Sequence, residues 1–194
     1  TLTIGAVIGR EFELRQLTRL VDDISEDRLI DVLEEGLSAR VIEELPNSVG
    51  RYQFTHALIQ QTLMGELSTT RRVRLHARIA ETLETLYAGN EEAHAAELAH
   101  LFAEAEAVLG TEKLVHYSLL AGDRALAAYA WEEALAHFQR GVRAKEGQPI
   151  DTETAALLFG LGRAQAATLE RLQVGIAVDT LRRAFDYFAD IGDI

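Results

Sequence analysis

The stretch of sequence that decides the fold is AGDRALAAYAWEEALAHFQRG, residues 121–141. Gly122 precedes Ala134 by twelve positions. Phe138 follows four positions later, and Gly141 comes three positions after that. Small residues allow two helices to approach closely, and an aromatic ring at this spacing can fill the gap between them. The spacing therefore predicts two antiparallel helices that interlock at these four positions.

The expected helix pair covers 111–129 and 131–145, and a second pair follows over 152–169 and 172–190. In the second pair Gly162 and Ala177 are fifteen positions apart, which predicts a longer turn. The pattern is typical of tetratricopeptide (TPR) repeats, although its offset of about 40 residues exceeds the usual 34. A plain array of helical hairpins has the same packing physics and stays an alternative.

The first part of the chain has another pattern, with short helices followed by a change to alternating residues. The expected elements are a helix over 11–21, a helix capped by Ser25, a hairpin with strands at Val41–Ile42 and Tyr52–Phe54, and a helix capped by Thr55. These elements predict a winged-helix-like domain over 1–67. TPR-like helices over 68–194 would follow, starting with a helix capped by Ser68 or Thr69 and a second helix over 91–109. The predicted fold class is therefore mainly α with one β-hairpin.

Composition narrows the class of protein. The chain has 194 residues, 48% hydrophobic and 26% charged, with a formal net charge of −12 and no cysteine. Disulfides and thiolate metal sites are therefore excluded. No apolar run approaches the ~18 residues of a membrane span and no signal peptide opens the chain, so we expect a cytoplasmic protein that does not contact membranes. Because Thr1 is not Met and helical arrays need about three repeats, we expect a piece of a longer chain that continues beyond Ile194.

The candidate chemical motifs favour packing over catalysis. Gly160–Gln165 begins like a dinucleotide fingerprint but lacks its third glycine and lies within a predicted helix. No P-loop motif occurs. Glu97 and His100 have the spacing of half a di-iron motif without a second copy. We interpret Trp131 as a packing residue. The sequence therefore predicts no enzyme activity, cofactor or metal in this segment.

One basic cluster stands out against the acidic background. Arg71, Arg72, Arg74 and Arg78 lie within a single predicted helix and form a possible interaction patch. They could contact nucleic-acid phosphates, or they could be the solvated face of an amphipathic helix. We favour the second interpretation, because the helix before the hairpin, 26–37, is acidic where a recognition helix would be basic or polar.

Several co-linear blocks resemble one family. They are VIGREF (7–12), LIDVLEEGL (29–37), YQFTHALI (52–59), LSTTRRVRLHARIAETLE (67–84), AAELAHLFAEA (95–105) and AGDRALAAYAWEEALAHF (121–138). Together they resemble the region after the ATPase core of bacterial STAND-type signal-transduction ATPases. These include large LuxR-type transcriptional regulators and ATPases fused to adenylate or guanylate cyclases. The resemblance covers most of the chain and is thinner after Phe138.

The resemblance implies an ATPase domain upstream in the same chain, a winged helix that acts as a mechanical relay, and TPR-like helices that sense an effector or partner. In some family members a winged-helix histidine contacts ADP, which makes His56 a candidate. A capping or packing role for His56 is the alternative that we favour. We therefore expect a non-catalytic regulatory segment, with a DNA-binding winged helix or a free-standing TPR adaptor as alternatives.

Overall fold

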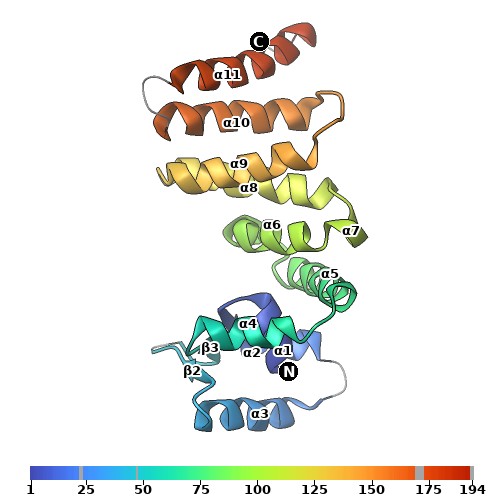
Figure 1. The fold of residues 1–194 in the computed structure, drawn as a ribbon, viewed down its shortest axis with the longest axis vertical. Helices are drawn as coiled ribbons and strands as arrows, with labels where there is room; N and C mark the ends of the chain where they lie inside the picture. Colours follow the sequence, from blue (N-terminus) through green and yellow to red (C-terminus); the bar gives the residue numbers. More distant parts are fainter. Residues whose placement is uncertain (22–23, 47, 169–172, 193–194) are drawn as a thin grey trace. The chain divides into compact units, whose positions relative to one another are not determined.

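The computed structural model describes residues 1–21, 24–46, 48–168 and 173–192 (Figure 1). The fold is mainly α with one small antiparallel sheet, as predicted. The chain divides into two compact units, Thr1–Ala88 and Gly89–Ile194. Asn47 of the predicted turn, residues 169 and 172 of the predicted last helix pair, and the final residues 193–194 lie outside the described residues.

Within its described residues, the first unit contains eight elements, five helices and three short strands. They are α1 (Leu2–Ile8), β1 (Glu11–Glu13), α2 (Leu14–Leu20), α3 (Glu26–Ser38), β2 (Ile42–Glu44), β3 (Arg51–Phe54), α4 (Ala57–Gly65) and α5 (Thr69–Leu86). The three strands pair antiparallel in the order β1-β3-β2. The predicted hairpin is therefore present, and a strand from before it completes the sheet.

The prediction of one helix over 11–21 was wrong at its start. Glu11–Glu13 forms β1, and Phe12 pairs with Tyr52 of β3. Phe12 is buried whereas Glu11 is exposed, which is the two-residue period of a strand. The helix α2 begins only at Leu14, whose N–H donates to the Gly50 carbonyl at 2.8 Å. Pairing with β3 thus satisfies backbone groups that a helix would otherwise have satisfied internally.

Aromatic rings of the sheet form the centre of the first unit's core. The Phe12 ring lies 5.9 Å from that of Tyr52 and 5.4 Å from that of Phe54, between ring centroids. Leu17, Leu20, Leu29, Leu33 and Ile42 are also fully buried in this unit. Gly5 of α1 faces the Phe12 ring, where an added Cβ would lie 3.1 Å from it. The sheet and three helices thus share one apolar core.

The boundary between the units differs from the predicted division at residue 67. Helix α5 packs against α1 and α2 and belongs to the first unit. Ile79 and Leu83 of α5 are fully buried. Beyond its end, the Tyr87 hydroxyl accepts a buried hydrogen bond of 2.7 Å from the Gln16 side chain of α2. These contacts place α5, which the sequence assigned to the repeat region, in the first unit.

Helix caps agree with the sequence at two positions and differ at a third. The Ser25 and Ser68 hydroxyls each accept from the backbone N–H three residues on, at 3.3 Å, as N-caps of α3 and α5. The predicted Thr55 cap was wrong, because His56 occupies the N-cap position of α4. The Thr55 hydroxyl donates to the Arg40 carbonyl at 2.8 Å instead.

The second unit is a series of helices in which neighbours along the chain pack together. It contains the 3₁₀ helix η1 (Glu91–His94) and the helices α6 (Ala95–Glu104), α7 (Glu106–Leu109), α8 (Glu112–Ala127), α9 (Trp131–Ala144), α10 (Thr152–Thr168) and α11 (Val174–Asp190). α8 packs on α9, α9 on α10, and α10 on α11. The helix predicted over 91–109 is divided into η1, α6 and α7, because the backbone leaves the α-helical conformation at His94 and Ala105.

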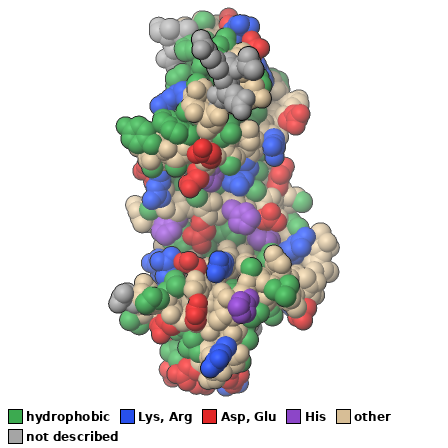
Figure 2. All heavy atoms as spheres, turned by 60° about the vertical axis from the view of Figure 1, so that its left-hand side comes forward, with side chains coloured by type: hydrophobic (Ala, Val, Ile, Leu, Met, Phe, Trp, Pro, Cys, Tyr) green, Lys and Arg blue, Asp and Glu red, His purple; other side chains and the backbone are tan. Residues whose placement is uncertain are grey.

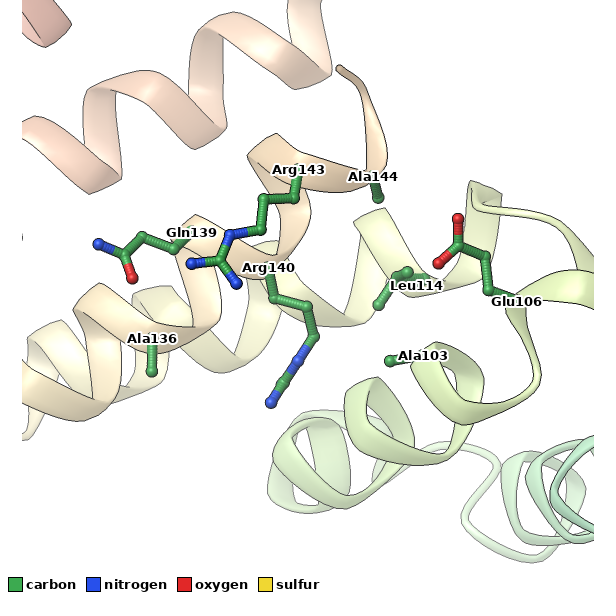
Figure 3. A pocket seen from close by; sticks show the side chains of 8 residues that line it. All are labelled: Ala103, Glu106, Leu114, Ala136, Gln139, Arg140, Arg143 and Ala144. Atoms are coloured by element: carbon green, nitrogen blue, oxygen red, sulfur yellow. The ribbon is translucent and has the colours of Figure 1, made fainter. Parts of the chain in front are cut away.

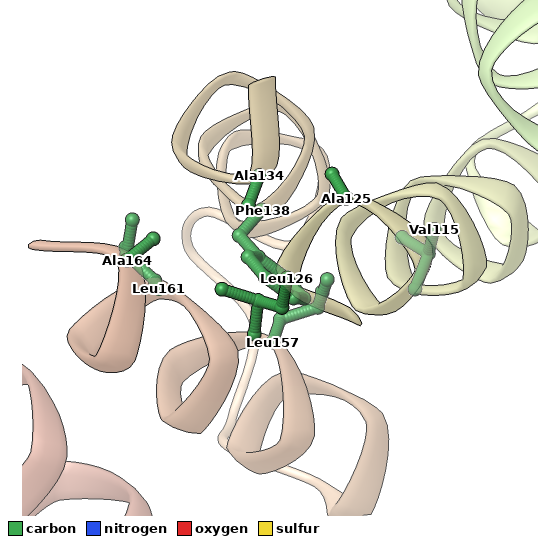
Figure 4. Close-up of a cluster of buried hydrophobic side chains, with 8 residues drawn as sticks. All are labelled: Val115, Ala125, Leu126, Ala134, Phe138, Leu157, Leu161 and Ala164. Carbon is green, nitrogen blue, oxygen red and sulfur yellow. The ribbon is translucent and has the colours of Figure 1, made fainter. Parts of the chain in front are cut away.

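Phe138 interlocks the second unit, as the spacing predicted (Figure 4). An added Cβ at Gly122 of α8 would lie 2.6 Å from the Phe138 ring, and one at Gly160 of α10 only 2.3 Å. The ring therefore occupies space that two glycines leave open on either side of α9. Gly141 and Gly162 make similar room for Leu157 and Leu181, where an added Cβ would lie 2.5 Å from each leucine. The assignment of these helices to TPR repeats stays a prediction.

Candidate functional site

Three of the four predicted arginines line one hollow of the first unit. Arg71, Arg74 and Arg78 lie at positions i, i+3 and i+7 of α5, which share one face of a helix. The hollow has a volume of about 610 Å³. Its other lining residues are Thr1, Thr3, Ile4, Glu66, Leu67 and Leu75. The structure thus forms a basic hollow, defined by these nine residues, between α5 and the start of α1.

Arg72 does not belong to the basic hollow. Arg72 lies on the same face of α5 as His76 and Ile79, four and seven residues later. The side chains of these two residues are fully buried. Arg72 itself is half-buried, whereas Arg71, Arg74 and Arg78 are exposed. α5 therefore buries one face and exposes the other, and Arg72 lies apart from the three exposed arginines. An interaction role for these arginines stays a prediction.

His56 lies away from the core of the first unit. Its side chain is exposed, and although it holds the N-cap position of α4, it makes no capping hydrogen bond. The favoured packing role was therefore wrong, and the capping role concerns only its backbone. The ADP contact implied by the family resemblance stays a prediction.

The exposed face of α3 is acidic. Figure 2 shows carboxylate side chains gathered over this helix, at the lower end of the view. Glu26, Asp27, Asp31, Glu34 and Glu35 are all exposed, and Arg28 is the one basic residue of α3. A duplex that approached α3 would meet carboxylates, which repel its phosphates. The structure thus strengthens the sequence argument against base reading by this helix.

The second unit has a hollow of about 400 Å³ that the sequence did not predict (Figure 3). Four of its lining residues are small or apolar, Ala103, Leu114, Ala136 and Ala144. Its polar residues are Glu106, Gln139, Arg140 and Arg143. Arg140 reaches from α9 towards α6, as Figure 3 shows. These eight residues define the α9 hollow, which is built entirely from α6, α7, α8 and α9.

Arg140 is the half-buried cation of the α9 hollow, whereas Arg143 is exposed. Burial lowers the pKa of the Arg140 guanidinium, and the charge of Glu104 opposes that shift. Its Nη1 lies 3.2 Å from Nδ1 of His137. Burial also lowers the pKa of His137, the Arg140 charge lowers it further, and Glu133 opposes both. The lowered pKa of His137 favours its neutral form beside the Arg140 cation. The partial burial of Arg140 removes part of the water around its guanidinium.

The sequence motifs weighed against catalysis have structural roles. Gly160 and Gly162 lie within α10 and admit Phe138 and Leu181, so close packing explains the glycine pair. Trp131 packs against the buried cluster around Phe138, which confirms its packing role. Glu97 forms an ion pair with His94 at 3.5 Å. Among the residues that the structure describes, no three His, Asp or Glu side chains are grouped so that they could hold a metal ion.

The α9 hollow could not have been found from sequence, because its walls come from four helices. The available signal was limited to Arg140 and Arg143, whose spacing of three places both on one face of a helix.

The described part of the chain contains no helix with the length and apolar character needed to cross a bilayer. Comparisons with models of protein families, with curated proteins and with solved structures gave no match to this chain.

Proposed function

We propose that this chain is a regulatory, protein-interaction segment of a larger signal-transducing ATPase that controls transcription. In this proposal the helical unit, 89–194, binds an effector or protein partner, and the first unit, 1–88, relays that event to the ATPase. The proposal rests on the co-linear sequence blocks and on one structural observation. That observation is the half-buried guanidinium of Arg140 in the α9 hollow.

A partly dehydrated cation favours an anionic partner. Arg140 has lost part of its hydration, and a carboxylate from a partner would replace it with charge-assisted hydrogen bonds. Arg143 and Gln139 line the same hollow and supply further donors. Because α9 is anchored through Phe138 between two neighbouring helices, these donors project from a well-packed support. A partner side chain with a carboxylate is therefore the group that this hollow suits best.

The relay would work by population shift. A partner that binds one arrangement of the segment more tightly changes the balance between two states of the ATPase by its difference in affinity. The segment itself needs no catalytic group for this role.

The alternative of DNA binding through the winged helix has less support, because the exposed face of α3 is acidic. A gel-shift assay at low salt distinguishes the two functions. The proposal predicts no shift of a DNA duplex, whereas a salt-sensitive shift would favour the alternative.

Two activity measurements test the proposal itself. The purified chain should hydrolyse ATP no faster than a buffer control, and turnover above that background would contradict it. In the parent protein, deletion of residues after Ala88 should change the rate of ATP hydrolysis, because a regulatory segment biases the ATPase. An unchanged rate in a correctly folded deletion variant would also contradict the proposal.

A further inference from the structure

The basic hollow of the first unit is a second polar site, and it does not depend on the proposed function. Arg71, Arg74 and Arg78 project from one face of α5 within seven residues, which is about 10 Å along the helix axis. The hollow of about 610 Å³ lies within the usual size range of small-molecule sites, about 300–1,000 Å³.

The charge of this site is opposite to that of the whole protein. Three guanidinium groups and the single carboxylate of Glu66 are the charged side chains that line it, so basic groups predominate among the lining residues. The chain as a whole carries a net charge of −12. A local cationic hollow in an acidic protein attracts an anion of matching charge, and a phosphate monoester carries roughly −1.5 to −2 at neutral pH.

The donors fit phosphate chemistry. Each guanidinium presents a planar fork of N–H groups that can bind two phosphate oxygens at once. The Thr3 hydroxyl lines the same hollow and can donate as well. Arg71 and Arg74 lie one turn apart on an 18-residue helix, so both can reach the same phosphate group.

The remaining lining residues indicate what the phosphate would be attached to. Ile4, Leu67 and Leu75 are aliphatic, and no aromatic side chain is among the residues that line the hollow. The site therefore offers contact to a short carbon chain or a sugar and lacks a ring on which a nucleobase could stack. We propose that the basic hollow binds a small phosphate monoester with a non-aromatic carbon skeleton, held by Arg71 and Arg74.

Nucleic acid fits this surface less well. Phosphate-backbone binding needs a basic track longer than one hollow. Arg72, the next arginine of the same helix, is half-buried on the other face and does not extend the track.

The test uses the full chain and glycerol 3-phosphate as the probe, with inorganic phosphate and acetate compared at equal ionic strength. Binding is followed by backbone-amide NMR shifts and by calorimetry. We expect glycerol 3-phosphate to bind more tightly than acetate and to shift amides of α5 and the start of α1. Arg74→Gln and Arg71→Gln should each weaken binding roughly tenfold or more, because each removes a charge-assisted hydrogen-bond pair.

Arg72→Gln is the matched control, because it removes the same charge from the same helix outside the hollow. It should change the dissociation constant by less than about twofold. Arg74 is exposed, so its replacement should leave the melting temperature unchanged. An equal loss from Arg72→Gln and Arg74→Gln would overturn the site in favour of diffuse electrostatics.

Two further outcomes would also overturn the proposal. Binding of acetate as tight as that of glycerol 3-phosphate would remove the specificity for phosphate. Tighter binding of a short DNA duplex or of a phosphoserine peptide, lost in Arg74→Gln, would assign the hollow to a macromolecular ligand.

Discussion

The two units solve the same packing problem in different ways. In the first unit, large side chains meet around a sheet. The closest glycines, Gly5 and Gly36, each leave 3.1 Å between an added Cβ and the nearest side chain, Phe12 and Ile42 respectively. In the second unit, the Phe138 ring occupies gaps where an added Cβ would come within 2.3–2.6 Å. The first core is therefore held mainly by contacts between large side chains. The second core also requires glycine at positions 122 and 160, because any side chain there would overlap the Phe138 ring. Substitutions that add or remove single groups should separate the two.

The largest effect is expected from Phe138→Ala. Removing a fully buried ring that packs between α8 and α10 should lower the free energy of unfolding of the second unit by about 3–5 kcal/mol. Hydrogen exchange of amides in α8–α10 should increase, while amides of the three-stranded sheet stay protected. Phe159→Ala is the matched control on α10, because Phe159 is 38% exposed, and its loss should be about 1 kcal/mol. Equal losses for the two variants would contradict the interlocked core.

The next effect is expected from Gly160→Ala, which adds one methyl group. Alanine favours a helix by ~1 kcal/mol over glycine, but the methyl would overlap the buried Phe138 ring. We expect a net loss of about 2 kcal/mol in chemical denaturation. Gly175→Ala in α11 is the control, because nothing lies within 4 Å of its added Cβ, and it should be neutral or stabilising. A stabilised Gly160→Ala variant would show that the gap is not filled.

In the first unit, Tyr87→Phe tests the attachment of α5. The variant loses the hydroxyl that accepts from Gln16, and the free energy of unfolding should fall by about 1 kcal/mol. Urea denaturation measures this difference. Tyr129→Phe, at an exposed tyrosine of the second unit, should leave stability unchanged. If Tyr87→Phe is also neutral, α5 does not depend on this bond.

A smaller effect on stability is expected at two positions just after helix ends, one in each unit. Both are non-glycine residues with left-handed backbone conformation. Arg40 has φ 55° and Tyr129 has φ 60°. Arg40→Gly should raise the melting temperature through a gain of about 0.5–1 kcal/mol. Tyr129→Gly should gain less, because it also loses an edge-to-face contact with Trp131 at 5.6 Å. Equal gains would show that this ring contact contributes nothing.

The smallest effect concerns the α9–α10 connection and depends on pH. Burial would raise the pKa of Asp151, but hydrogen bonds from Lys145 and Thr154 outweigh it and lower that pKa to about 2. A lowered carboxyl pKa stabilises the fold above the unfolded value of 3.8, and this contribution is lost as the pH falls towards 2. Asp151→Asn keeps a capping oxygen and loses the charge. Because Asp151 is half-exposed, its deficit at pH 7 should stay below about 1 kcal/mol.

The measurement is thermal unfolding of both proteins between pH 7 and pH 2. The difference between them should shrink as the pH falls below 4. A difference that is independent of pH would contradict the role of the charge.

The sequence predicted the interlocked helices well because helical spacing is rigid. Twelve positions between Gly122 and Ala134, with Phe138 one turn later, leave few other packings. The strand β1 could not be predicted, because three residues show only one alternation and its partner β3 begins 40 residues after Glu11. The sequence also could not predict that α5 belongs to the first unit. An amphipathic pattern indicates which face of a helix is buried but not which elements pack against that face.

The candidate sites were predicted less completely than the fold. The arginine cluster could be recognised from the sequence, but its division between two faces of α5 could not. Successive residues of a helix point about 100° apart, so Arg71 lines the hollow and Arg72 does not. The α9 hollow forms because α6 and α7 lie beside Arg140 of α9. Local sequence patterns do not indicate which helices pack together, so this hollow could not be predicted.

The proposal that this chain is part of a signal-transducing ATPase is tested most directly by reading the open reading frame upstream of Thr1. We predict a P-loop motif, G-x-x-x-x-G-K-[ST], in the same frame before residues 1–88. A start codon directly before Thr1 would contradict it and leave the free-standing helical adaptor as the function of this chain.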